Sequence, residues 1–293
     1  MAGQEKDARP QFAPCPLTEV VAEIKRTEPA VVFAPHVETS LGILLPDTYI
    51  SAVADAVHSY GGVFVIDAIA AGNVWCDMKK TGVDVLISAP QKGWTGPSCA
   101  GLVLLSERAA KIVKNAEGGA EWEPKSQSFC CNLRQWLDVV EKYEGGGFKY
   151  YTTLPTDALM TFRNVIKETE AFGIAKTKAE MLRLGQSVRD ALKKRGFKSV
   201  AADGFAAPGV VVVYDNEDRE SRGTSMIARF KSAGIQIAGG VPFKLGEDNF
   251  DTPLNSRACT FRIGLFGLDK MMNVDECVRR FETALDKAMK KDA

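Results

Sequence analysis

Short apolar runs alternate with stretches of helical spacing over the first 110 residues of the chain. The apolar runs lie at residues 31–34, 63–66, 84–88 and 101–105, and each is bounded by polar or turn-forming residues. Between the first two runs, Ile50, Val53 and Val57 recur at helical spacing, which predicts a helix over residues 46–60. Strands that are apolar on both sides and separated by helices indicate an α/β layer with a mostly parallel sheet.

The pattern changes after Gly145, Gly146 and Gly147. Helices are predicted before this break at 106–117 and 133–143, and a long helical stretch follows it at 156–195, interrupted near Gly173. Beyond it, strands are predicted at 210–214, 235–238 and 260–263, with a helix at 224–233. Asn273 is expected to cap a last helix over 274–291. We therefore divide the chain into a partial α/β large domain, residues 1–172, and a smaller α+β C-terminal domain, residues 173–293.

Composition narrows the class of protein. The 293 residues carry 37 Lys and Arg against 37 Asp and Glu, with 45% hydrophobic residues, which is typical of a folded domain with a sizeable core. The balanced charge argues against nucleic acid as the main partner. Only two histidines are present, His36 and His58, which excludes a His-rich metal site, and we expect no metal.

Seven cysteines without a Cys-x-x-Cys pair indicate reduced thiols rather than a disulfide framework, so we expect an intracellular protein, in the cytoplasm or an organelle. No window of about 18 apolar residues predicts a membrane span. The opening segment has mixed charge and several prolines, unlike a secretory signal.

Polar residues follow three of the predicted strands. The first strand leads into His36 and Thr39, the second into Asp67, and the third into Gln91 and Lys92. Ligands of open α/β sheets bind outside the carboxyl ends of the strands, so these side chains are expected around one crevice.

Lys92 and Asp67 have the chemistry that pyridoxal 5'-phosphate (PLP) requires. An amine must bind the cofactor covalently, and a carboxylate must keep the ring nitrogen protonated so that the ring accepts electrons. The residues alone leave a second interpretation open, in which Asp67 caps a helix and Lys92 is a solvated loop lysine.

Four segments in order resemble the class V aminotransferases of PLP fold type I, and most closely the alanine–glyoxylate and serine–pyruvate group. They are HVETSLGI (36–43), VIDAIAAG (65–72), SAPQKGW (88–94) and FRIGLFGLDK (261–270). The resemblance runs from about Val20 to the C-terminus. It implies the type I fold, dependence on PLP, and transfer of an amino group from a small amino acid such as alanine or serine to a 2-oxo acid such as glyoxylate or pyruvate.

The resemblance also assigns roles to single residues. Lys92 matches the lysine that binds the cofactor, and Asp67 matches the partner of the ring nitrogen. Thr39 matches a hydroxyl that contacts the cofactor ring on its oxygen side, and Gln91 a residue that helps to hold the phosphate. Arg262 matches the arginine that binds the substrate α-carboxylate, a bidentate task that suits a planar guanidinium.

Tyr150 and Thr153 match positions that reach the cofactor phosphate of the neighbouring subunit, so the resemblance implies a homodimer. The family also has a long N-terminal segment that carries the phosphate-binding loop, a ring-stacking aromatic and much of the dimer contact. The printed sequence shows no counterpart of this segment. We therefore expect an exposed edge of the sheet, impaired dimerisation, and weak or absent binding of PLP by this chain.

Two alternatives stay open. In the first alternative to the aminotransferase, the chain is a catalytically impaired paralogue or fragment that associates with a longer subunit. In the second, it is a lyase of the same fold that resembles the cysteine desulfurases. Against the second alternative, Gln91 stands where desulfurases have histidine before the lysine. Cys259 is also poorly placed as a mobile nucleophile, because it precedes Arg262 by three residues.

Overall fold

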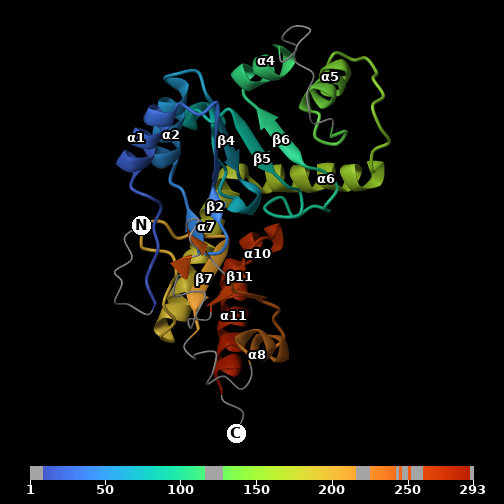
Figure 1. Ribbon diagram of the computed structural model, residues 1–293. Helices are drawn as coiled ribbons and strands as arrows, with labels where there is room; N and C mark the ends of the chain where they lie inside the picture. Colours follow the sequence, from blue (N-terminus) through green and yellow to red (C-terminus); the bar gives the residue numbers. More distant parts are fainter. Residues whose placement is uncertain are drawn as a thin grey trace.

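The computed structural model describes residues 9–115, 128–215, 225–241, 244–245, 250–251 and 260–290. A mainly parallel sheet in the first half of the chain is followed by a small antiparallel sheet in the second half (Figure 1). Cys259 and the ends of three predicted helices, at 116–117, 224 and 291, lie outside the described residues.

The first sheet has four strands in the order β1-β4-β5-β6. They are β1 (Val31–Pro35), β4 (Val63–Asp67), β5 (Val85–Ser88) and β6 (Leu102–Leu105). The first three run parallel, whereas β6 runs antiparallel to β5. No crossover helix lies between Ser88 and Leu102, and a chain that returns without a crossover pairs antiparallel to the strand it leaves.

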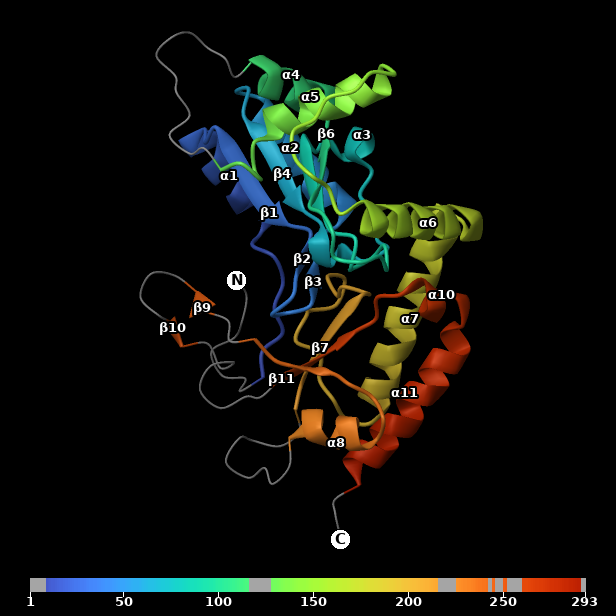
Figure 2. The ribbon, with the colours of Figure 1, turned by 90° about the vertical axis from the view of Figure 1, so that its right-hand side faces the viewer.

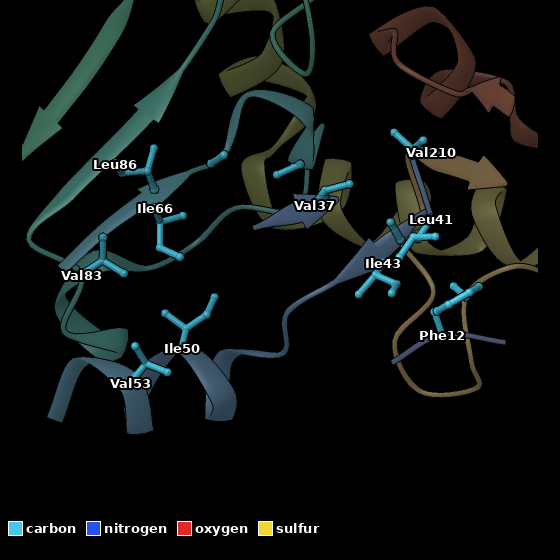
Figure 3. Close-up of a cluster of buried hydrophobic side chains, with 14 of the residues drawn as sticks. Phe12, Val37, Leu41, Ile43, Ile50, Val53, Ile66, Val83, Leu86 and Val210 are labelled. Carbon is cyan, nitrogen blue, oxygen red and sulfur yellow. The ribbon is translucent and has the colours of Figure 1, made fainter. Parts of the chain in front are cut away.

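Helices α1 (Leu17–Thr27) and α2 (Asp47–His58) pack against each other and cover one face of this sheet (Figure 2). Ile50 and Val53 of α2 extend towards Ile66 and Leu86 of the strands (Figure 3). Ile50 and Ile66 have no exposed surface, and full burial of such a side chain contributes about 1.5–3 kcal/mol. This packing fixes the strands whose ends carry the candidate site.

The opposite face, which we call the open face, is covered incompletely by the described residues. Val31 and Phe33 of β1 are 55% and 58% exposed, and Val103 of β6 is 39% exposed. Strand register aligns Phe33 with Val65, which is only half-buried. Because the strands are apolar on both sides, the sequence predicts a sheet that is covered on both faces. In the described part of the chain, helices cover only one face of this sheet. Strand β1 is an edge of this sheet, as expected.

Short elements connect these strands. The two-residue strands β2 (Val37–Glu38) and β3 (Ile43–Leu44) form a hairpin, and the 3-10 turn η1 (Ile69–Ala71) follows β4. Helix α3 (Met78–Thr81) precedes β5, and α4 (Glu107–Asn115) follows β6.

Three helices lead into the second half. They are α5 (Leu133–Glu144), α6 (Thr156–Phe172) and α7 (Ile174–Lys194). Gly173 separates the last two, and its φ of 104° is a backbone angle that residues with a Cβ atom rarely adopt. The predicted interruption near Gly173 is therefore confirmed. The domain boundary near residue 172 falls at this glycine and stays a prediction.

The second sheet has the order β7-β11-β8 and is antiparallel. Its strands are β7 (Val210–Tyr214), β11 (Thr260–Gly264) and β8 (Ala238–Gly239), and every residue of β7 is buried. Helices α7, α8 (Met226–Ser232) and α11 (Val274–Met289) enclose the core around Phe230 and Phe261. Strands β9 (Lys244–Leu245) and β10 (Phe250–Asp251) form a separate pair.

Two local predictions are wrong. The strand predicted at 235–238 forms only at Ala238, because the amide of Ile235 donates to the carbonyl of Phe230 and ends α8 instead. Asn273 precedes α11 but does not cap it, since its side-chain amide donates to the carbonyl of Asp269 in α10 (Leu268–Met272).

Among the described residues, no helix combines the length and the apolar character that crossing a bilayer requires.

Candidate functional site

Asp67 is the last residue of β4 and lies at the carboxyl edge of the parallel strands. Its register partners are Pro35 of β1 and Ile87 of β5, so three strand ends meet there. Carboxylate Oδ1 accepts the backbone amide of Ile69 at 2.9 Å, which fixes the side chain over the start of η1. Oδ2 has no hydrogen-bond partner among the described residues and remains able to accept one.

Lys92 lies in the loop that leaves β5. Within this loop the amide of Thr95 donates to the carbonyl of Lys92 at 3.1 Å, and the amide of Gly96 donates to that of Pro90 at 2.8 Å. The hydroxyl of Thr95 accepts the amide of Leu268 at 3.2 Å, which ties the loop to the start of α10. Lys92 is therefore held by a turn that is anchored to the second half of the chain.

Phe266 links this loop to the end of β4. The ammonium Nζ of Lys92 lies 5.9 Å from the centre of the Phe266 ring, within the range of a cation–π contact. The same ring lies against Gly72, because a Cβ atom placed there would be 3.1 Å from Phe266 Cε1. Backbone packing is closer still at Gly93, where a Cβ atom would lie 2.1 Å from the carbonyl oxygen of Gly72. The structure thus brings the Lys92 loop beside the turn that follows Asp67.

Thr39 lies at the turn of the β2–β3 hairpin, and β2 contacts η1. The carboxylate of Glu38 accepts the amide of Ser40 at 2.7 Å, and the amide of Gly42 donates to the carbonyl of Glu38 at 2.8 Å. Glu38 therefore stabilises the turn that presents Thr39. Gln91, beside Lys92, is exposed.

Arg262 lies on β11, the central strand of the second sheet. Its Nε donates to the carbonyl of Gly239 on β8 at 2.8 Å, which orients the half-buried guanidinium. Nη1 and Nη2 have no partner among the described residues. Arg262 precedes Phe266 by four residues, so the strand that carries the candidate carboxylate-binding group leads directly to the ring beside Lys92.

Tyr150 and Thr153 lie together before α6. Their hydroxyls are 3.0 Å apart, and Tyr150 is 66% exposed. Among the described residues, neither hydroxyl makes a hydrogen bond to another candidate residue of the same chain.

The side chains of two histidines and two tryptophans in the first half of the chain are hydrogen-bonded, buried or packed against each other. His58 Nε2 is 2.9 Å from Asp84 Oδ2, so this histidine has a partner in the scaffold of the first sheet. His36 is buried, and burial lowers its pKa to about 4, although Asp47 opposes the shift and Lys178 adds to it. Trp75 and Trp94 pack against each other with ring centres 4.6 Å apart and ring planes tilted by 42°.

Phe266 and the Gly72–Gly93 contact were not foreseen from the sequence. Phe266 lies within the quoted FRIGLFGLDK segment, yet an apolar residue after a strand looks like core. The two glycines lie in the turns after Asp67 and Lys92, and this shared position was the only signal available.

Comparison with protein families matches residues 13–216 to the family described as aminotransferase class-V. Among curated proteins, alanine–glyoxylate aminotransferase 1 of Saccharomyces cerevisiae is 24% identical over 238 residues, covering 79% of this chain and 58% of the relative. Serine–glyoxylate aminotransferase of Hyphomicrobium methylovorum is 26% identical over 236 residues, covering 78% of this chain and 55% of the relative. The chain thus spans little more than half the length of these relatives.

Solved structures show the same fold. Ureidoglycine–glyoxylate aminotransferase of Bacillus subtilis has a TM-score of 0.72 at 22% identity, covering 95% of this chain and 66% of that one. Alanine–glyoxylate aminotransferase of Nostoc sp. has a TM-score of 0.69 at 20% identity, covering 94% and 66%. At this identity the likeness supports the fold alone.

Proposed function

The chain belongs to the class V aminotransferases, a family of PLP-dependent enzymes, and we propose that it transfers the amino group of a small amino acid, alanine or serine, to a 2-oxo acid such as glyoxylate or pyruvate. The observation that carries this proposal is the contact between the Lys92 loop and the turn after Asp67, made through Gly93, Gly72 and Phe266.

The residues at these strand ends fit PLP in two respects. Lys92 Nζ has no hydrogen bond or ion pair among the described residues, so its amine is available for a covalent bond to an aldehyde. Asp67 Oδ2 is likewise without a partner, whereas Oδ1 is fixed by Ile69, so the carboxylate is oriented and can still accept a hydrogen bond from a protonated ring nitrogen. Thr39 lies in the turn after β2 and Gln91 in the loop after β5, and these two residues are proposed to contact the ring and phosphate.

PLP, when bound, supplies a ring that accepts electrons from the substrate Cα. In this proposal Arg262 binds the substrate carboxylate through Nη1 and Nη2, since Nε is already held by Gly239. Nζ of Lys92 removes the Cα proton and later returns one, because an amine beside the reacting carbon can act as a general base and then as a general acid. Asp67 holds the proton of the ring nitrogen.

A homodimer is part of the proposal. Tyr150 and Thr153 are exposed and hydrogen-bonded to each other, which supports a role towards a neighbouring subunit rather than towards their own Lys92. Weak PLP binding by this chain alone stays a prediction.

The test is a PLP titration followed by visible absorbance, with transamination of alanine and serine measured against glyoxylate and pyruvate. We expect Lys92→Ala to abolish both the yellow colour and turnover. The matched control is Lys79→Ala, because Lys79 is exposed on α3. A yellow and active Lys92→Ala protein contradicts the assignment of Lys92. A wild-type chain that stays colourless at saturating PLP supports the alternative of an impaired chain that associates with a longer subunit.

A further inference from the structure

Beside α7 and β7 lies a cavity of about 470 Å³ that the proposed transamination does not use. Its walls come from the C-terminal half of α7, the segment that follows this helix, and the N-terminal segment at Gln11. The charged side chains that line it are Arg189, Asp190, Lys193, Lys198 and Asp203. A cavity of this size is sufficient for a small organic molecule.

Arg189 is the unusual group of this cavity. Its Nη2 donates to the carbonyl of Ala207 at 2.5 Å and lies 3.5 Å from that of Val210, while its Nε is buried without any partner. No carboxylate of the described residues pairs with it. Backbone carbonyls therefore satisfy part of its hydrogen-bonding capacity, but nothing described neutralises its charge.

Burial disfavours the charged form of this guanidinium. Loss of contact with water lowers the pKa of Arg189 to about 10, which is the direction expected when a cation is desolvated without an anion beside it. The other arginine at the end of α7, Arg195, pairs with Asp286 at 2.6 Å, and there the pKa is raised. Arg189 therefore differs from Arg195 in having no carboxylate partner among the described residues.

The surroundings of Arg189 select the kind of anion. Asp190 accepts a hydrogen bond from Gln186 at 2.9 Å and does not reach Arg189, and Asp203 is also on the wall. Two carboxylates among three basic groups disfavour a multiply charged ligand. Phe197 and Val213 border the cavity from the core and are only 5% and 2% exposed, and the ring of Phe197 is fixed edge-on to Phe261 with centres 5.4 Å apart.

We propose that this cavity binds a small monocarboxylate, and that Arg189 Nη1 is the group that receives the carboxylate. Of the three guanidinium nitrogens, Nη2 is bonded to backbone carbonyls and Nε is buried without a partner. Nη1 is in neither situation, so it is the nitrogen left to bind a ligand. The ligand thereby supplies the charge that the described residues leave out, and charge-assisted hydrogen bonds of this kind are the strong ones.

The experiment is calorimetric titration of the full chain with propionate, which has no amino or oxo group and so cannot take part in transamination. We expect wild type to bind propionate and Arg189→Gln to bind at least tenfold more weakly. Arg262→Gln, which alters the proposed substrate site, is expected to leave this affinity unchanged. Loss of binding in Arg262→Gln with retention in Arg189→Gln overturns the proposal and places the carboxylate at the other site.

Arg189→Gln also removes a contact to Ala207, so a second variant separates folding from binding. Ala206 lines the cavity, and Ala206→Phe fills it while leaving Arg189 in place. We expect Ala206→Phe to melt within a few degrees of wild type and to lose propionate binding. Unchanged binding in this variant overturns the proposal, as does the absence of propionate binding to wild type. Tighter binding of inorganic phosphate than of propionate overturns the choice of a monocarboxylate.

Discussion

Gly93 lies so close to Gly72 that a Cβ atom at position 93 would be 2.1 Å from the carbonyl oxygen of residue 72. A Cβ atom at position 93 therefore forces the two turns apart, and overpacking of this kind costs about 1–3 kcal/mol. We predict that Gly93→Ala lowers the free energy of unfolding by that amount, measured by urea denaturation.

Gly101 is the matched control for this substitution. A Cβ atom there meets nothing within 4 Å, so Gly101→Ala is expected to change stability by less than about 0.5 kcal/mol. Equal stability of the two variants would mean that the turns adapt to a methyl group and that the Gly72–Gly93 contact does not position Lys92.

Asp84 connects the first sheet to its neighbours from a buried position. It accepts hydrogen bonds from the amide of Phe64 at 2.9 Å and from Arg108 at 2.8 Å, and it is 2.9 Å from His58. Burial alone raises the pKa of Asp84, but these contacts outweigh it and leave the pKa below its ordinary value. The stabilisation is therefore present above about pH 4 and is lost as pH falls through the lowered pKa.

We predict that Asp84→Asn costs about 2–4 kcal/mol at pH 7, because it leaves positive charge without its buried partner. The difference from wild type should shrink as pH falls below 4 towards the lowered pKa of Asp84, where the folded wild type takes up a proton as well. Asp55→Asn, an exposed change on α2, is the control and should shift stability little. Chemical denaturation from pH 3 to pH 7 measures both; a difference that is constant with pH would contradict the assigned charge.

His36 gives stability a second dependence on pH. Its pKa falls from 6.5 to about 4 on burial, so the unfolded chain binds the proton more readily than the folded one. Stability is then complete above pH 6.5 and falls by up to about 3 kcal/mol as pH drops to 4. In His36→Phe this slope should be reduced. Denaturation at pH 5 and pH 7 tests it, and an unchanged slope would show that His36 is protonated in the folded protein.

Phe33 and Phe64 lie on adjacent strands but on opposite faces of the first sheet. Phe33 is 58% exposed on the open face, and Phe64 has no exposed surface under α2. We predict that Phe64→Ala costs about 3–5 kcal/mol and Phe33→Ala less than about 1 kcal/mol. Thermal denaturation of the two variants checks this. A loss at Phe33 as large as at Phe64 would mean that the open face is covered in solution.

Strand positions and the larger helices could be predicted because their spacing is strong. Helix α2 and strands β1, β4 and β7 form close to where the pattern indicates them. Helix α1 was missed although Leu17, Val20 and Ile24 carry the same spacing. The hairpin of β2 and β3 could not be predicted, since two-residue strands have no period to detect. The direction of β6 depends on a loop that has no signature of its own.

The candidate site divides in the same way. Strand ends follow from the sequence, so the position of Asp67 at the carboxyl edge of the parallel strands was predictable from topology. The packing of Phe266 beneath Lys92 depends on how the second sheet meets the first, which no local pattern encodes. Arg189 was missed because its distinguishing property is the lack of a counter-charge in three dimensions, not its place in the sequence.

The open face also determines how this protein responds to denaturants and to heat. The heat capacity change of unfolding and the denaturant m-value both grow with the apolar surface that unfolding newly exposes. Val31, Phe33 and Val103 already contact water in the folded chain, so their exposure contributes less to either quantity. The folded chain should therefore unfold over a broader denaturant range than a domain of equal length whose sheet is enclosed on both sides, and its stability curve should be flatter with temperature.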